Sequence, residues 1–194
     1  MGVLRVTTPV AVRLEPSSYI QERSLAASWR FCGVLMTEFR QLTSDDQEQL
    51  WNWFHIALRD PPPAGLRPRE ILQNPDIRIY VERWGQPGDV GVVAVVDGTD
   101  IGACWMRLLP PGVGSASVDE HTPQLGIALL PDHQHKGHGT GLLHAGLTAA
   151  ATDGYCQVSL TVHPENPAIS LYERCGFRKI GVRNTYDLMV AAVS

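Results

Sequence analysis

The sequence predicts an α/β fold built on one mixed sheet, and three observations support this prediction. Strand-like and helix-like apolar periodicities alternate along the chain. A glycine-rich stretch separates a buried strand from a helix near residues 131–147. A further strand, a helix and two closing strands follow between 157 and 191. We therefore expect the order strand, helix or helices, three strands, helix, strand, helix and two strands.

The composition is that of a globular domain, with 194 residues, 44% hydrophobic, 19% charged and a formal net charge of −4. This charge disfavours broad electrostatic binding to nucleic acid or to an anionic membrane. No apolar stretch approaches the roughly 20 residues that cross a bilayer. The four cysteines are scattered without CxxC spacing, which argues against a zinc knuckle, a redox pair or a disulfide-stapled secreted domain. We expect a soluble cytoplasmic protein with reduced thiols.

Residues 1–35 differ from the rest of the chain and are predicted to be an N-terminal extension, disordered or outside the core. They contain four arginines and no clear apolar period. An alternative is that translation starts at Met36, directly before the first strand-like segment. The domain itself is expected over 36–194.

The first half of the domain begins with a strand and a helix. The apolar stripe of this helix consists of Leu50, Phe54, Ala57 and Leu58. Ser44 and Gln47 have the spacing of a capping box, and prolines at 61–63 end the helix. Residues 75–85 fit a short helix or a strand. Two β runs then flank Asp97-Gly98, which is typical of a hairpin turn.

The second half contains the clearest helix boundaries. The buried strand 123–131 precedes three glycines at alternate positions, Gly137, Gly139 and Gly141. The helix after them is expected to end at Gly154, and 157–163 alternates as a strand. For the next helix, we expect Asn166 as N-cap, Pro167 as first residue and Gly176 just past the end.

A strand, a glycine-rich turn and a helix start together are typical of an anion site, and the alternative is a glycine turn needed only for tight packing. The first N–H groups of a helix lack internal partners, the helix dipole adds positive charge, and glycine lets phosphate oxygens approach closely. Two known phosphate patterns fail here. Leu142 stands where the dinucleotide fingerprint needs its third glycine, and no G-x-x-x-x-G-K-[S/T] is present.

The spacing Gln134-x-x-Gly137-x-Gly139 instead resembles the Q/R-x-x-G-x-G/A signature of the GNAT superfamily of N-acetyltransferases. About thirty residues later, a second block resembles that family at Asn166, Ala168, Leu171, Tyr172, Gly176 and Phe177. The resemblance covers roughly 36–191. It implies a GNAT acyltransferase fold, with a mixed, mostly antiparallel, splayed sheet and helices on both faces. It also implies acetyl transfer from acetyl-CoA, as cosubstrate, to a primary amine.

The resemblance implies a coenzyme site made largely of main chain. The pyrophosphate would lie against Gln134, His135, Lys136, Gly137, His138, Gly139 and Thr140. The pantetheine arm would pair with the strand at Ile127, Ala128 and Leu129, where a bulge would leave an N–H free for the thioester carbonyl. Asn166 is expected both to cap its helix and to contact the coenzyme arm.

Tyr172 is the expected acid, because a phenol within reach of the sulfur can protonate the leaving thiolate. The alternative is that Tyr172 is only a core residue. The general base is less defined, since the fourth strand holds Gln124 where some family members have a glutamate. Glu120 is the expected base, with Asp119 and His121 beside it. A weakly basic amine would need no protein base. No cysteine matches a nucleophile position, which predicts direct transfer in a ternary complex.

Other features are expected to serve the acceptor or the core. Trp51, Trp53, His55, Tyr80 and Trp84 are expected either to wall an acceptor pocket or to be core aromatics. The histidines around the glycine loop lack a carboxylate or cysteine partner, so no metal is expected.

Two other functions remain open. One is a non-catalytic module that senses acyl-CoA, and the other is a dinucleotide oxidoreductase. Acetyl-CoA and an amine are the expected partners, without nucleic acid or membrane, and the last strands (177–191) offer edges for a possible homodimer.

Overall fold

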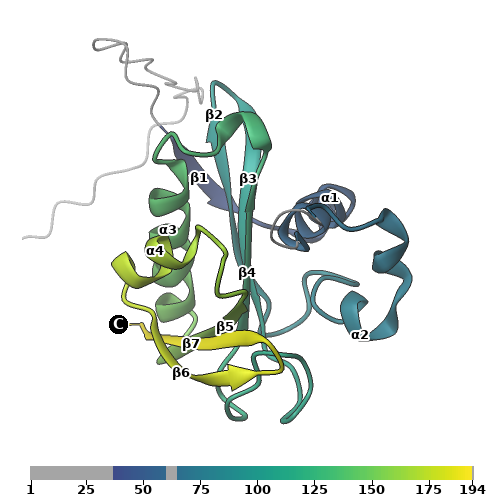
Figure 1. The fold of residues 1–194 in the computed structure, drawn as a ribbon. Coiled ribbons are helices and arrows are strands. Elements are labelled where there is room, and N and C mark those ends of the chain that lie inside the picture. The colour runs from purple at the N-terminus through teal and green to yellow at the C-terminus, as the bar shows by residue number, and fades with distance from the viewer. Residues whose placement is uncertain (1–36, 60–64, 194) are drawn as a thin grey trace, which may run out of the picture. The chain divides into compact units, whose positions relative to one another are not determined.

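The computed structural model describes residues 37–59 and 65–193, and these residues form a seven-stranded sheet with helices on both faces (Figure 1). The extension predicted for 1–35 and the proline turn at 61–63 lie outside the described residues. The strand order is β1-β2-β3-β4-β5-β7-β6. The strands are β1 (Glu38–Gln41), β2 (Val90–Val96), β3 (Thr99–Arg107), β4 (Gln124–Leu129), β5 (Gln157–Val162), β6 (Arg178–Arg183) and β7 (Tyr186–Ala192). Among the strands of the described residues, only β4 and β5 pair in parallel.

In the described part of the chain, four α-helices cover the sheet. Helices α1 (Gln47–Ala57) and α2 (Pro75–Arg78) lie on one side, and α3 (His138–Thr152) and α4 (Ile169–Arg174) lie on the other (Figure 1). The α/β fold class and the predicted order of elements are confirmed, and 75–85 begins as a helix. No helix among the described residues is long and apolar enough to cross a membrane.

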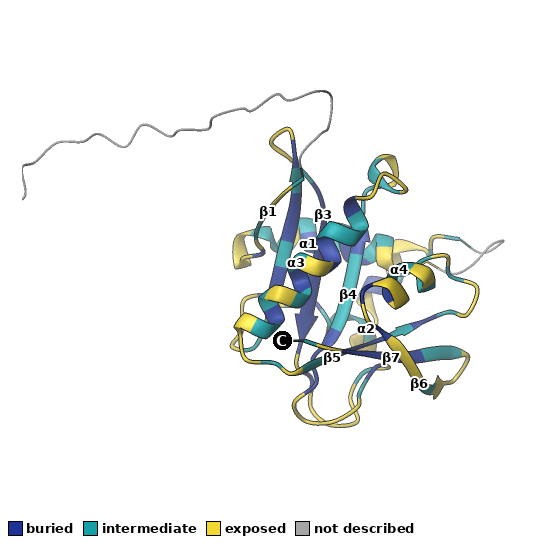
Figure 2. Ribbon diagram, turned by 90° about the vertical axis from the view of Figure 1, so that its left-hand side faces the viewer, coloured by how far each residue is buried: buried dark blue, intermediate teal, exposed yellow. Residues whose placement is uncertain are grey.

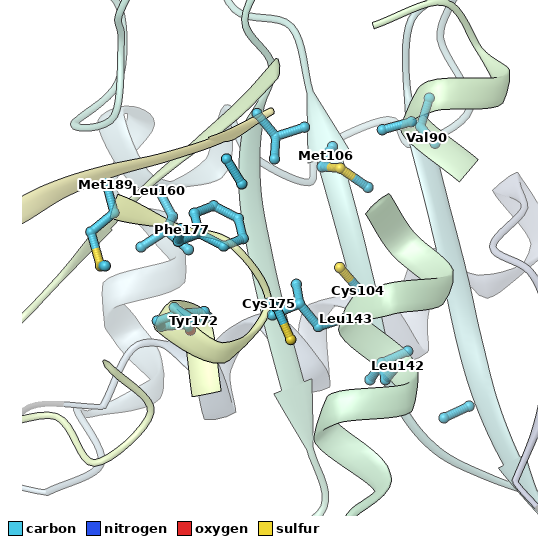
Figure 3. Close-up of a cluster of buried hydrophobic side chains, with 14 of the residues drawn as sticks. Val90, Cys104, Met106, Leu142, Leu143, Leu160, Tyr172, Cys175, Phe177 and Met189 are labelled. Carbon is cyan, nitrogen blue, oxygen red and sulfur yellow. The ribbon is translucent and has the colours of Figure 1, made fainter. Parts of the chain in front are cut away.

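Each face of the sheet carries its own apolar core. The core under α3 and α4 includes Leu142, Leu160, Tyr172 and Phe177, and Figure 3 shows these side chains converging from helices and strands. The core under α1 is aromatic, and it includes Trp53, Phe54 and Trp105. A separate apolar cluster therefore packs on each face of the sheet.

Local turn chemistry explains two boundaries of these elements. Asp97 and Gly98 both have positive φ, 50° and 74°, so the predicted hairpin turn is confirmed. The predicted capping box at α1 is wrong by one residue. Asp46 accepts the Thr43 N–H at 2.8 Å, whereas the Gln47 side chain donates to the Val81 carbonyl.

Helix α4 also begins later than expected. The carboxamide oxygen of Asn166 accepts the Ala168 N–H at 2.9 Å and so closes a turn, but the helix starts at Ile169. Pro167 therefore lies in this preceding turn, not in the first helical position. Gly176 does follow the helix end and has φ of 91°.

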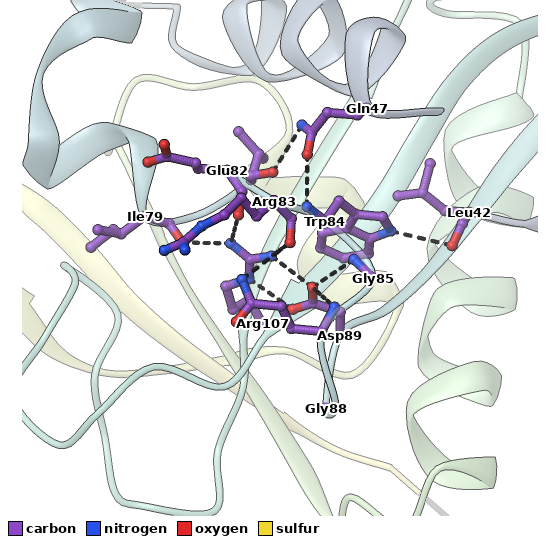
Figure 4. Close-up of polar contacts among 12 residues, drawn as sticks. Leu42, Gln47, Ile79, Glu82, Arg83, Trp84, Gly85, Gly88, Asp89 and Arg107 are labelled. Carbon is purple, nitrogen blue, oxygen red and sulfur yellow. Dashed lines mark hydrogen bonds and ion pairs between the residues drawn. The ribbon is translucent and has the colours of Figure 1, made fainter. Parts of the chain in front are cut away.

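A buried ion pair joins β3 to the segment between α2 and β2 (Figure 4). Arg107 and Asp89 contact at 2.6 Å, with side chains only 9% and 3% exposed. Arg107 also donates to the carbonyls of Ile79 and Glu82 at 2.9 and 2.8 Å. This network fixes the main chain on both sides of Tyr80.

Candidate functional site

The turn before α3 presents main-chain donors to solvent. His135 and Gly137 both have positive φ, 58° and 89°, and alternation of this kind forms an anion-binding concavity. Among the described residues, the N–H groups of 135–139 donate no hydrogen bond to protein. His135, Lys136 and Gly137 are exposed, so the helix mouth is open. These donors fit a pyrophosphate, because each lacks a partner and lies where the helix dipole favours negative charge.

Two side chains of this loop support it from within. Gln134 donates through Nε2 to the Leu129 carbonyl at 2.9 Å, which ties the loop to the end of β4. His138 is buried, and its Nδ1 lies 2.7 Å from the Thr37 hydroxyl. The ring of His138 thus contacts the residue before β1, and only its main chain belongs to the open mouth.

The sheet opens between β4 and β5. Their pairing is limited to Gln124 with Ser159. On the other side of β4, Leu130 donates to Ile101, and bonded pairs recur at every second residue of an antiparallel ladder. The main chain of 125, 127 and 129 therefore faces β5, and the N–H groups of Ile127 and Leu129 have no partner on that strand.

The residues predicted for the pantetheine arm divide between the two sides of β4. Ile127 and Leu129 direct main chain toward the opening, and their side chains pack against the core under α3 and α4. Ala128 is different, because its main chain pairs with Ala103 of β3 and its side chain lies in the core under α1. Figure 2 shows β4 as a half-buried strand bordered by α3 and α4.

The predicted bulge in β4 is not present in this stretch. The register runs without a shift from Gly102–Leu129 to Arg107–Gln124. The free donors arise instead because β5 diverges after its first contacts with β4. The same chemical feature, an unpaired strand edge, is thus produced by splaying alone.

Tyr172 lies at the apolar side of this opening (Figure 3). Its ring packs edge-on against Phe177, with centroids 5.7 Å apart. Burial raises the pKa of the Tyr172 phenol. The hydroxyl has no hydrogen-bond partner among the described residues, yet it is not one of their fully buried unpaired atoms. It is therefore a protonated hydroxyl whose oxygen is not completely enclosed by protein.

The residues considered for the base lie at the far end of β4 from the glycine loop. The Glu120 side chain is 71% exposed, and its carboxylate lies 3.5 Å from His121 Nε2. Asp119 accepts from Thr122 and from the His121 N–H, and these hydrogen bonds lower its pKa. Gln124 is buried and binds the Val113 carbonyl and the Ala116 N–H.

A chain of hydroxyls, which sequence reasoning did not find, lies on the α1 side of the opening. Ser115 Oγ is 2.8 Å from Thr161 Oγ1 on β5, two residues beyond the pair that joins β4 and β5. The Ser115 N–H donates to the Tyr80 hydroxyl at 2.7 Å. Tyr80 was expected near the acceptor, but Ser115 and Thr161 are ordinary in a loop and a strand, so their sequence context held no signal.

Most of the other predicted wall aromatics belong to the core. Trp53 and Trp84 are buried, at 0% and 4% exposure. Trp51 stacks with Arg78 at 5.6 Å, on the side of α1 that faces α2. His55 binds the Arg67 carbonyl through Nε2 at 2.7 Å. Of the two alternatives that the sequence left open, Trp53 and Trp84 therefore follow the one in which they are core aromatics.

Among the histidines of the loop region, His133 and His138 have ring centroids 6.0 Å apart, but the other contacts of this group differ. His138 contacts Thr37, His144 lies 3.8 Å from Cys175 Sγ, and His135 is exposed. Among the residues that the structure describes, no three His, Cys, Asp or Glu side chains gather as metal ligands do.

The family model for the acetyltransferase (GNAT) family matches residues 38–177. The chain belongs to this family. A mycothiol acetyltransferase of Clavibacter sepedonicus is 32% identical over 158 residues, which are 79% of this chain and 46% of that protein. An N-alpha-acetyltransferase of Saccharolobus solfataricus is 29% identical over 127 residues, 60% of this chain and 72% of that protein.

Solved structures agree on the GNAT fold. A PaiA N-acetyltransferase from Thermoplasma acidophilum, crystallised with coenzyme A, superposes with a TM-score of 0.60 at 20% identity. It covers 81% of this chain and 99% of the other. The chain spans about half the length of the mycothiol acetyltransferases that it matches. Membership of the GNAT family also replaces the dinucleotide-oxidoreductase alternative.

Proposed function

We propose that this GNAT protein transfers an acetyl group from acetyl-CoA to a primary amine, directly, in a ternary complex. The observation that supports this most is the presence of two open main-chain surfaces in one site. These are the unpaired donors of 135–139 and the unpaired edge of β4 at 127–129. The donors of 135–139 fit an anion, and the edge of β4 fits an extended arm that carries amide groups. Acetyl-CoA, which has both parts, supplies the thioester as activated acyl group.

Each residue then has a role that follows from its position. The N–H groups of 135–139, with the positive side chain of Lys136, bind phosphate oxygens. The free N–H of Ile127 or Leu129 stabilises the negative charge that grows on the thioester carbonyl. The amide N–H₂ of Asn166 remains to contact the coenzyme arm, because its oxygen is engaged by Ala168.

Tyr172 assists departure of the thiolate. A thiol has a pKa of about 8.5, below that of a phenol whose pKa burial has raised. Tyr172 therefore stabilises the departing sulfur by donating a hydrogen bond, and solvent completes the net protonation.

The acceptor amine approaches from the α1 side and must lose a proton. Glu120 stays the predicted base, and Glu120→Gln tests it. The alternative is loss of the proton to water held by the hydroxyls of Thr161, Ser115 and Tyr80. An unchanged kcat/KM in Glu120→Gln assigns proton removal to solvent, whereas a loss of about 100-fold assigns it to Glu120.

The decisive experiment measures thiol release from acetyl-CoA with a panel of amines, beside calorimetric titration with coenzyme A. We expect binding of coenzyme A and thiol release that depends on the amine. Intact mass after incubation with acetyl-CoA alone should show no acetylated protein. Binding without thiol release would favour the acyl-CoA sensor, and an absence of binding would refute the coenzyme site itself.

A further inference from the structure

A hollow adjoins the opening between β4 and β5 on the α1 side, from which the acceptor amine is proposed to approach. This side is called the acceptor side below. The hollow is a cavity of about 340 Å³ between the loop 108–123 and the turn that joins β6 to β7. Its lining includes Ser115, Ser117, Arg183 and Asn184, together with glycines and a valine. No residue predicted for the coenzyme lines this cavity.

Ser115 connects the cavity to the reacting region. Its hydroxyl reaches Thr161 of β5 at 2.8 Å, and its N–H donates to Tyr80 at 2.7 Å. Thr161 lies just beyond the last pairing of β5 with β4. A molecule seated in the cavity would therefore have its next atoms beside the splayed strands, where the proposed function places the acetyl group.

The charge of the cavity comes from one guanidinium. Arg183 donates through Nη2 to the Ser117 carbonyl at 3.1 Å, which positions the group at the cavity rim. A guanidinium has five N–H donors, and no other hydrogen bond of Arg183 is found among the described residues. The described lining residues include no carboxylate.

Three carboxylates lie in the neighbouring elements, namely Asp187 of β7 and the adjacent Asp119 and Glu120 of the loop 108–123, and none of them lines the cavity. Asp187 of β7 pairs with Lys179 of β6. Asp119, in the loop 108–123, accepts hydrogen bonds from Thr122 and Gln157. Lys179 offsets the charge of Asp187, and neither Asp119 nor Glu120 contacts Arg183 among the described residues.

We propose that the acceptor is a small amine whose molecule also carries an anionic oxygen group, a carboxylate or a phosphate, bound by Arg183. This inference rests on the proposed function and names the class of its acceptor. The planar guanidinium matches two oxygens of such a group at once, and this pairing is strong because both partners are charged. A polyamine or an aminoglycoside would instead place further cations beside Arg183 and meet repulsion.

The test compares amines in matched pairs by kcat/KM in the thiol-release assay. Alanyl-alanine is paired with its C-terminal amide, and phosphoethanolamine with ethanolamine; spermidine and kanamycin represent polycations. We expect the anionic member of one pair to be preferred at least tenfold, and the pair with the larger ratio separates carboxylate from phosphate. Arg183→Gln should remove this preference and leave the KM for acetyl-CoA unchanged. Arg183→Lys should retain part of it.

Arg178→Gln is the matched control, because Arg178 is an exposed arginine of the same strand that does not line the cavity. Its preference ratio should equal that of the parent protein. Preference for spermidine, kanamycin or the neutral members overturns the inference, and so does a ratio that survives Arg183→Gln.

A binding readout separates this inference from the proposed function. In the presence of coenzyme A, the preferred anionic amine should raise the Tm of the parent protein but not that of Arg183→Gln. Thiol release from polycations alone would refute the acceptor class and leave the acetyltransferase proposal standing. An absence of thiol release from every amine would refute the proposed function. Equal Tm shifts in both proteins would refute the role of Arg183.

Discussion

At the scale of single residues, burial determines what the Tyr172 hydroxyl can do. Its apolar surroundings raise the pKa above the usual value of about 10, so the phenol stays protonated through the neutral range. Tyr172→Phe removes this donor and should lower kcat about 100-fold, with little change in the KM for acetyl-CoA. Because ionisation of Tyr172 is displaced upward, the parent kcat/KM should rise with pH as the amine deprotonates and show no fall below about pH 10.

Tyr155 provides the control for this prediction. Its hydroxyl donates to the Gly88 carbonyl at 2.9 Å, and burial raises its pKa as well. Tyr155 lies between α3 and β5, at the end of α3 remote from the glycine loop. Tyr155→Phe should therefore retain kcat. Equal losses in the two variants would contradict a chemical role for Tyr172.

At the scale of elements, the two ends of α3 carry glycines in the same conformation. Gly137 has φ of 89° and Gly154 has φ of 92°, and a Cβ at either would meet no atom within 4 Å. Alanine at each should therefore cost the same backbone strain, about 1–2 kcal/mol. Only Gly137→Ala distorts the main-chain donors of 135–139 that are proposed to bind coenzyme A. We therefore expect the Kd for coenzyme A to rise about tenfold in Gly137→Ala and to stay constant in Gly154→Ala. Calorimetry measures both, and equal Kd values would contradict the phosphate site.

Local chemistry explains which elements the sequence could predict. Gly137 and Gly154 mark the two ends of α3, and Asp97-Gly98 forms the hairpin turn. Positive φ is favoured by single residue types, glycine above all, so these boundaries can be predicted from residue identity alone. Helix starts were less accurate. Thr43, with Asp46 as its partner, forms the capping box that was expected at Ser44 and Gln47, and Asn166 closes a turn three residues before α4 begins. Several short side chains near a helix start can serve as caps, and the surrounding packing decides among them.

At the scale of the whole molecule, the sequence did not predict contacts between segments that are far apart along the chain. The hydroxyl chain joins Tyr80, Ser115 and Thr161, which come from three separate segments. The ion pair of Arg107 with Asp89 depends likewise on how the loop after α2 folds over β3. Neither the hydroxyl chain nor the ion pair has a pattern in the local sequence, because the partners meet only once the sheet has formed. The acceptor side is therefore where sequence reasoning was weakest.

The Arg107–Asp89 pair provides a stability prediction at this scale. Removing one partner of a buried pair leaves an uncompensated charge, so Asp89→Asn should lower the free energy of unfolding by about 3–5 kcal/mol. Asp100→Asn is the control, because Asp100 pairs with Arg40 at the surface, with side chains 36% and 39% exposed, where such pairs contribute at most about 1 kcal/mol. Urea unfolding measures both, and equal losses would contradict the burial argument.

Asp89→Asn should also weaken binding of the acceptor amine. Arg107 holds the carbonyls of Ile79 and Glu82, which flank Tyr80, and Asp89 orients Arg107. Loosening this segment displaces the Tyr80 hydroxyl from Ser115 without touching the glycine loop. Below its melting temperature, Asp89→Asn should therefore raise the KM for the amine and leave the Kd for coenzyme A unchanged. A parallel loss of both affinities would mean that the variant is globally perturbed and that the two substrate sides are not anchored separately.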